Sequence, residues 1–126
     1  MENQTGACPF LNGEGLCSIH AFRPGICRLF PLGRYYHDGS FSYVLMTGEC
    51  KRESRSKIKI DKWLGESNLK AYEQFVMQWK EILEQTRGKI AEVSDLEEQK
   101  KLSMSLLQTY YLTPYGADFF TGFSVR

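Results

Sequence analysis

The chain has 126 residues, of which 42% are hydrophobic and 25% charged, and its formal net charge is +1. This length fits one domain, and the near-neutral charge gives no general attraction for nucleic acid or for an anionic membrane. No apolar run approaches the roughly 20 residues of a membrane span, and the first residues lack the basic and apolar regions of a secretory signal. We therefore expect a cytoplasmic protein without a membrane partner, in which clustered cysteines serve as ligands rather than as disulfides.

All four cysteines fall in the first 50 residues: Cys8, Cys17, Cys27 and Cys50. The segment around them is rich in Gly, Pro and Arg and poor in helical periodicity, so it offers little apolar surface for a core. Four thiolates on one metal centre would hold it, and four is the number needed for tetrahedral zinc or a cubane iron–sulfur cluster. The spacings contain no C-x₂-C knuckle, so two disulfides or plain buried thiols are the alternative.

The first half of the chain is predicted to hold loops and one β-hairpin. Residues 1–32 read as irregular, with turn signals at 12–15 and 23–25 and a helix-blocking proline at Pro31. A hairpin is predicted from arms at 33–36 and 41–47 around an Asp38-Gly39 turn, and it would return Cys50 toward the earlier cysteines. The basic run that follows, over 51–62, is expected to be a solvated face, with a short strand at 58–60 and a helical turn at 61–64.

Two long helices are predicted in the second half. The first starts at an N-cap on Ser67 and runs to about Arg87, with Gly88 as its stop. The second runs over 95–112 and opens on a capping box at Ser94, and Thr113-Pro114 ends it. Apolar stripes at helical spacing run along both helices, and the tail after them carries three Phe that need burial.

The predicted fold is therefore α+β: a loop-rich cysteine and metal knob with a small β-hairpin, packed on two long antiparallel helices. Residues 1–60 would form the cysteine-cluster region with its hairpin, and residues 61–126 the helical region of one compact domain.

Three further residues stand close to the cysteines in sequence. His20 could replace a thiolate on zinc, although we favour a role in packing or in hydrogen bonding to a ligand. Arg23 and Arg28 flank Cys27, where cations would favour the thiolate form and offset the charge of a four-thiolate site. His37 falls in the predicted hairpin turn, where we expect no role for it.

The motifs around the cysteines resemble one known family. Cys8-Pro9-Phe10-Leu11, the C-x-I-H of residues 17–20, Arg23-Pro24, the CRLFP of residues 27–31 and Cys50 downstream follow the pattern of the YkgJ-type cysteine-cluster family. The resemblance covers about the first fifty residues and implies chelation of zinc or iron; flagellin lysine N-methylases carry a related cluster. Members normally begin with an upstream C-x₂-C-x₃-C-C motif, and the residues before Cys8 do not contain it.

We accordingly predict a metal centre on Cys8, Cys17, Cys27 and Cys50, with His20, Arg23 and Arg28 as supporting groups. Iron, as an ion or an iron–sulfur cluster, is slightly favoured over structural zinc because paired knuckles are missing. Two alternatives remain open. One is a component of an iron–sulfur-dependent enzyme, a protein-lysine methyltransferase or an oxidoreductase, although no nucleophile paired with a base is visible. The other is a zinc-stabilised module that binds a protein partner through an uncovered helical face over 69–83.

Overall fold

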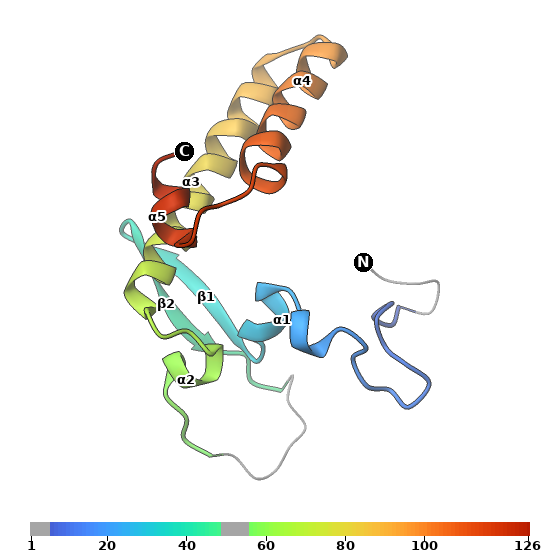
Figure 1. The fold of residues 1–126 in the computed structure, drawn as a ribbon, viewed down its shortest axis with the longest axis vertical. Helices are drawn as coiled ribbons and strands as arrows, with labels where there is room; N and C mark the ends of the chain where they lie inside the picture. The colour runs from blue at the N-terminus through green and yellow to red at the C-terminus, as the bar shows by residue number, and fades with distance from the viewer. Residues whose placement is uncertain (1–5, 49–55) are drawn as a thin grey trace. The chain divides into compact units, whose positions relative to one another are not determined.

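The computed structural model describes residues 6–48 and 56–126. A short 3₁₀ helix η1 (His20–Phe22) and helix α1 (Gly25–Leu29) come first, followed by a hairpin of strands β1 (Leu32–His37) and β2 (Ser40–Leu45). Four further helical segments and a π-helical turn follow: α2 (Ile60–Leu64), α3 (Leu69–Glu92), α4 (Leu96–Leu107), the π-turn η2 (Gln108–Leu112) and α5 (Phe119–Ser124). Figure 1 labels the α-helices and the two strands. An antiparallel hairpin together with two long helices confirms the predicted α+β class.

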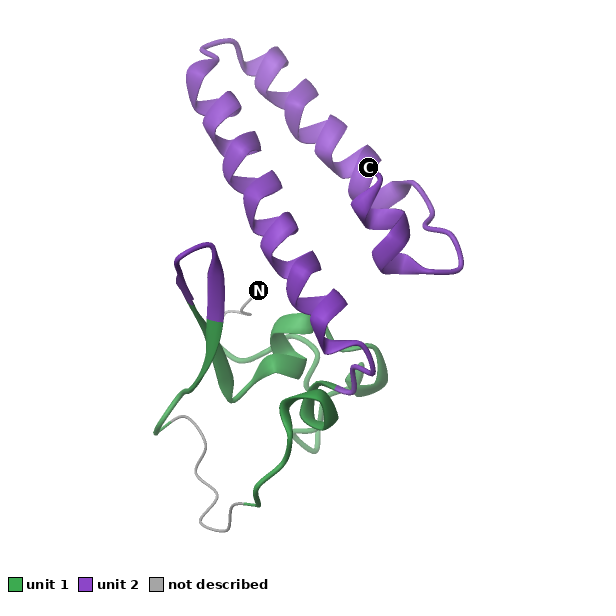
Figure 2. Cartoon of the chain, turned by 90° about the vertical axis from the view of Figure 1, so that its left-hand side faces the viewer, with its two compact units in different colours: residues 1–35, 42–64 green, residues 36–41, 65–126 purple. Residues whose placement is uncertain are grey.

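The chain divides into two compact units, coloured in Figure 2. Unit 1 comprises residues 1–35 and 42–64 and holds the cysteine-rich segment and α2. Unit 2 comprises residues 36–41 and 65–126, so it holds the turn end of the hairpin and helices α3 to α5.

Unit 1 contains more local structure than predicted. The expectation of an irregular segment was wrong at η1 and α1, because short backbone bonds close both turns: Phe22 N–H donates to Ile19 O at 2.8 Å and Cys27 N–H to Pro24 O at 2.9 Å. The predicted strand at 58–60 was also wrong. Residues 56–59 have no regular structure, and Ile60 already begins α2.

The core of unit 1 is small. Helices α1 and α2 are in contact, and the buried side chains are Leu29 and Leu64, at 6% and 7% exposure. Trp63 of α2 is 40% exposed, and among the large hydrophobic side chains described in the unit Phe22 and Ile26 are the most exposed, at 86% and 78%. Apolar burial therefore contributes little to holding this unit, as the composition predicted.

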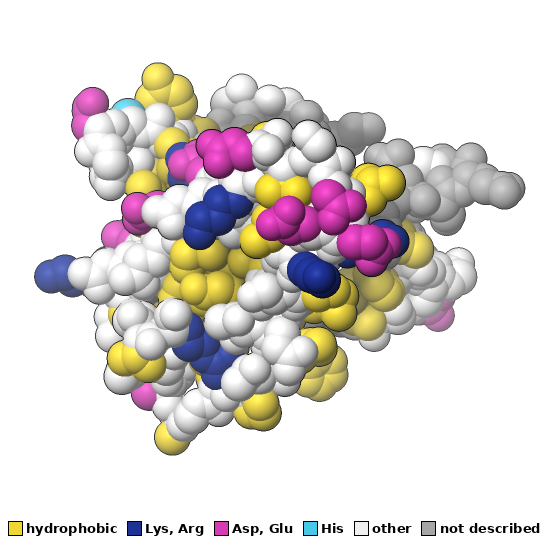
Figure 3. Space-filling view, turned by 90° about the horizontal axis from the view of Figure 1, so that it is seen from above, with side chains coloured by type: hydrophobic (Ala, Val, Ile, Leu, Met, Phe, Trp, Pro, Cys, Tyr) yellow, Lys and Arg dark blue, Asp and Glu magenta, His cyan; other side chains and the backbone are white. Residues whose placement is uncertain are grey.

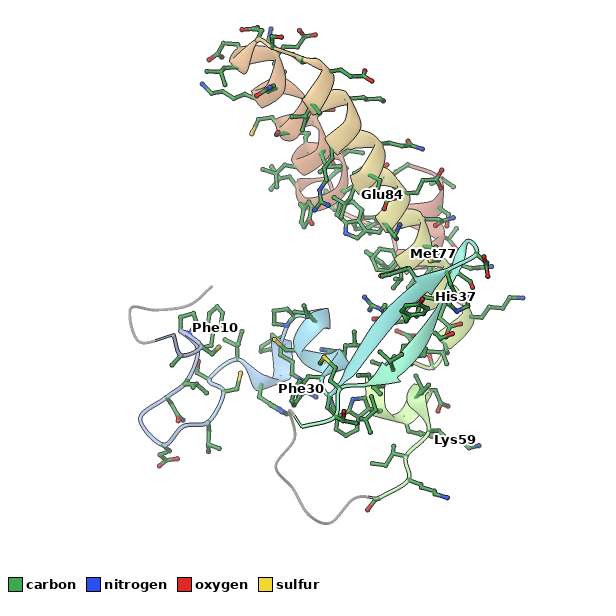
Figure 4. The ribbon with its side chains drawn as sticks, turned by 180° about the vertical axis from the view of Figure 1, so that it is seen from behind. Phe10, Phe30, His37, Lys59, Met77 and Glu84 are labelled. Atoms are coloured by element: carbon green, nitrogen blue, oxygen red, sulfur yellow. The ribbon has the colours of Figure 1, made fainter. Side chains whose placement is uncertain are left out.

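The hairpin turn is the one predicted. Asp38 and Gly39 both have positive φ, +46° and +70°, as a two-residue type I′ turn requires. His37, the last residue of β1, lies beside this turn in Figure 4, with Nδ1 3.8 Å from the Asp38 carboxylate.

In unit 2, α3 and α4 run antiparallel, side by side (Figures 1 and 2). Asn68 caps α3 by accepting a hydrogen bond from Ala71 N–H at 3.1 Å, one residue after the predicted cap. The predicted stop at Gly88 was wrong, and the helix continues to Glu92. One exposed glycine inside a helix costs only about 1 kcal/mol, which the packing of a long helix offsets.

The connection to α4 is short and capped. Asp95, one residue after the predicted cap, accepts hydrogen bonds from the N–H groups of Glu97 and Glu98. Gln99 reaches back and donates to the Val93 carbonyl at 2.6 Å, which ties the start of α4 to the end of α3. At its other end α4 passes into the π-turn, which ends at Leu112 with Thr113 as its C-cap, where the sequence predicted the end of the helix.

Aromatic rings form the core of unit 2. Phe123 of α5 is the most buried hydrophobic side chain described, at 4% exposure, and its ring centroid lies 4.7 Å from that of Phe75 on α3. Trp79, one turn further along α3, meets the ring of Tyr110 at 5.4 Å. The tail thus folds back as a helix that the sequence did not predict, and it buries Phe123 while Phe119 stays 39% exposed.

Arg126, two residues after α5, connects the tail to the end of the preceding helix. The Arg126 guanidinium donates to the carbonyls of Thr109, Thr113 and Pro114 and lies 3.8 Å from the ring centroid of Tyr115. These carbonyls belong to the π-turn and the residues just after it, where the helix leaves acceptors without intrahelical partners. Arg126 therefore caps the end of the α4 and η2 helix.

Charged side chains of both signs share the face of the described residues that Figure 3 draws. On the face in Figure 3, acidic and basic side chains are interspersed with hydrophobic ones, in keeping with the net charge of +1. Within the described ranges, no helix has the length and apolar character needed to cross a membrane.

Candidate metal centre

Cys8 and Cys17 lie at the two ends of one closed loop. Leu11 forms an isolated antiparallel bridge with Cys17, and Leu11 N–H donates to Cys8 O at 3.2 Å. The N–H and the hydroxyl of Ser18 both donate to Phe10 O at 2.8 Å. Figure 4 labels Phe10 in this loop. Both cysteines have free thiols, and as residues Cys8 is exposed and Cys17 is half-buried.

The turn of this loop is organised by Asn12. Its side-chain Oδ1 accepts hydrogen bonds from Glu14 N–H at 3.0 Å and from Leu16 N–H at 2.9 Å. Its backbone N–H donates to Leu16 O at 2.8 Å, and Gly15, with φ +76°, donates to Asn12 O at 3.0 Å. The sequence marked this stretch only as a turn. The Asn-Gly dipeptide was the available signal, because Asn side chains often bond to backbone N–H groups two residues on.

Cys27 lies on α1, with its thiol exposed. The neighbouring Arg28 turns its guanidinium back to the preceding segment and donates to Arg23 O at 3.3 Å and Ala21 O at 3.4 Å. That segment is joined in turn to Cys17, whose carbonyl accepts from His20 N–H at 3.3 Å. Arg28 therefore fastens the turn after Cys17 to the helix that carries Cys27.

His20 and Arg23 form a side-chain pair. Nη1 of Arg23 lies 3.1 Å from Nε2 of His20. Because a guanidinium only donates, Nε2 of His20 is the acceptor of a hydrogen bond between the two side chains. In this arrangement the Nε2 lone pair is already engaged by Arg23, and His20 acts as a neighbour of the cysteine segment.

The thiols of Cys8, Cys17 and Cys27 are all free. In the described residues, 6–48 and 56–126, no three Cys, His, Asp or Glu side chains converge on a point that could hold a metal ion. Cys50 lies outside the described residues, so the four-cysteine set stays a prediction. The donor chemistry fits the predicted group, because accessible thiols are the soft ligands that zinc and iron–sulfur centres use.

A cleft of about 470 Å³ lies in unit 2, between the turn end of the hairpin and α3. Its walls include Lys70, Glu73 and Met77, and Figure 4 labels Met77 on α3. Neither a cysteine nor a histidine lines it. None of the predicted metal ligands therefore lies in the walls of this cleft, and we do not assign it to the metal centre.

Comparison with known proteins gives one match. The CxxCxxCC family, described as "Putative zinc- or iron-chelating domain", matches residues 1–63, a segment that covers half of the chain and includes all four cysteines. Neither the curated proteins nor the solved structures gave a match. This description supports metal binding and agrees with the resemblance read from the cysteine motifs. On this match, the chain belongs to the CxxCxxCC family.

Proposed function

We propose that the chain binds one metal centre through the thiolates of Cys8, Cys17, Cys27 and Cys50. The observation that carries the proposal is that the three described cysteines are free thiols, each on a turn closed by backbone hydrogen bonds. Free thiols held on separate short turns are what a multidentate site needs, since the metal then has only to draw the turns together.

The metal that fits best is iron, as an ion or as an iron–sulfur cluster, with zinc as the alternative. Four thiolates complete the tetrahedron of zinc and leave no open position, so zinc would be structural. A cluster would add electron transfer, with Arg28 and nearby backbone N–H groups tuning its potential. The cysteine spacings favour iron, because they lack the paired knuckles of structural zinc sites.

Metal binding is expected to be coupled to the folding of unit 1. The buried hydrophobic residues described there are Leu29 and Leu64 alone, whereas a structural zinc site contributes roughly 10 kcal/mol or more to folding in small domains. Loading should therefore draw residues 8–50 together and protect them from proteolysis, and a chelator should reverse both effects.

Anaerobic purification followed by elemental analysis and a visible absorption spectrum tests the proposal. Iron with acid-labile sulfide and a brown colour selects the cluster, iron without sulfide selects the ion, and colourless zinc selects the structural site. Cys27→Ser should lose the metal while Ile26→Ala keeps it. Ile26 is the matched control because it is the adjacent residue of α1, is exposed and has no donor atom in its side chain. Full metal content in Cys27→Ser would refute the ligand set.

The alternatives receive less support. A protein-binding module was to be favoured by an uncovered apolar face over 69–83. Instead Val76 of that stripe is buried, and Phe75 and Trp79 are in ring contact with α5 and η2. An enzyme would need a cleft with acid–base groups near the thiols, and the cleft described in unit 2 has no cysteine in its walls.

A further inference from the structure

The side chain of Asn12, in the cysteine-rich segment, accepts two hydrogen bonds from the backbone although the residue is exposed. Asn12 is exposed and contributes nothing to a core, yet its single carboxamide oxygen accepts from two backbone N–H groups, those of Glu14 and Leu16. The second bond spans four residues and closes the turn across its whole width. A loop without a hydrophobic core is not held in one conformation by burial. Local hydrogen bonds from side chain to backbone restrict its conformations instead.

The two arms that this turn joins carry Cys8 and Cys17. Beyond the turn, the arms pair through the Leu11 and Cys17 bridge and through the bonds from Ser18 to Phe10 O. A slip of one residue in such an antiparallel pair would turn the Cys17 side chain to the opposite face. The register is short, so the turn must specify it.

We propose that Asn12 is a positioning residue, which sets the register that allows Cys8 and Cys17 to share a metal ion without being a ligand itself. This inference rests on the proposed function. It goes beyond it by assigning the geometry of one ligand pair to a side chain outside the cysteine motifs. The chemical requirement is an acceptor oxygen three bonds from Cα, bonded to Cγ, which Asn and Asp supply and Ala does not.

The test uses Cd²⁺, a soft ion that two thiolates bind and whose thiolate complex absorbs in the ultraviolet. In the full chain with Cys27→Ser and Cys50→Ser, only Cys8 and Cys17 remain as thiols, and a Cd²⁺ titration reports their joint geometry. Asn12→Ala should weaken Cd²⁺ binding about tenfold, as expected for two exposed hydrogen bonds. Asn12→Asp should restore it, because the carboxylate keeps the acceptor. Glu14→Gln should change the Cd²⁺ affinity by less than about twofold, because Glu14 contributes only its backbone N–H to the turn. This variant serves as the control for the loss of one charge in the loop.

Equal Cd²⁺ affinity in Asn12→Ala and the parent would overturn the assignment, as would a failure of Asn12→Asp to restore binding. The helical circular dichroism of all variants should be unchanged, since Asn12 lies in unit 1 and the long helices lie in unit 2. The outcome is separable from the proposed function. A parent chain that takes up neither iron nor zinc refutes the metal centre, whereas the Cd²⁺ series still decides whether Asn12 sets the pair.

Discussion

Replacing Phe123 by alanine should cost unit 2 a large part of its stability. The ring is 4% exposed and its centroid lies within 6.4 Å of the centroids of five other rings. Those rings belong to Phe75, Trp79, Tyr110, Tyr115 and Phe119. Truncating a buried Phe to Ala costs about 3–5 kcal/mol, through lost burial and the cavity left behind. We take about 3 kcal/mol, because Phe119 is partly exposed and can collapse into the space.

Urea unfolding followed by circular dichroism at 222 nm measures this loss. Most helical residues lie in α3 and α4, with 24 and 12 residues, so the signal reports mainly on unit 2. With a slope of about 1.5 kcal/mol per M urea, a loss of 3 kcal/mol lowers the midpoint by about 2 M. Val125→Ala is the matched control, because Val125 directly follows α5 and is 81% exposed, and its midpoint should shift by less than about 0.3 M.

A midpoint for Phe123→Ala within about 0.5 M of the parent, at unchanged slope, would refute this reasoning. It would mean that α5 does not seat its ring between α3 and the π-turn. A changed slope would instead show that the denatured or native state had changed in compactness, and the free energies would then need a second probe such as amide hydrogen exchange.

Three further outcomes are expected in unit 2. Arg126→Ala should lower the free energy of unfolding by about 1–2 kcal/mol in urea titrations, and Arg126→Lys should recover only part, because an ammonium lacks the planar fork that meets several carbonyls. The hydrogen bond from the Thr121 hydroxyl is the largest cause that lowers the pKa of Asp118 below its usual 3.8. Desolvation opposes it, and the backbone N–H groups of Thr121 and Phe120 each lower the pKa by less. Its contribution to stability is therefore present above pH 3.8 and lost as the pH falls through the lower folded value, and Asp118→Asn should flatten the melting temperature against pH in that range. Asn68→Ala should remove the α3 cap at a cost of about 1 kcal/mol, seen as a lower urea midpoint.

The parts of the fold that sequence could predict are those fixed by neighbouring residues. The hairpin was located because Asp38 and Gly39 adopt positive φ readily, and both long helices because their apolar residues recur at helical spacing. Helix ends were predicted less well. Gly88 was predicted to end the helix because glycine has a low helix propensity. The packing of the rest of α3 outweighs that cost, so the helix continues.

Elements that depend on distant partners were missed. Helix α5 is six residues long and exists because Phe123 finds a site among rings from α3 and η2 and Arg126 finds carbonyls beyond the π-turn. Neither interaction leaves a periodic signal in so short a segment. The strand predicted near Ile60 was wrong because a strand needs a pairing partner, and the local sequence does not show whether one is present.

For the metal centre, residue type and motif carried the prediction. Thiols at Cys8, Cys17 and Cys27 could be identified from the cysteine pattern, and the match over residues 1–63 supports the chemistry. The hydrogen bonds of Asn12 and Arg28 could not be predicted in the same way. Both side chains bond to backbone atoms, and the identity of a side chain does not reveal the backbone geometry around it.

The two tryptophans fall one to each unit, Trp63 on α2 and Trp79 on α3. Each unit thus carries its own intrinsic fluorophore, partly exposed in α2 and ringed by aromatic neighbours in α3. Chains with Trp63→Phe or Trp79→Phe would let the emission of one indole be followed at a time, without an attached dye. The melting of the cysteine-bearing half and of the helical half can then be watched as separate optical events in the same molecule.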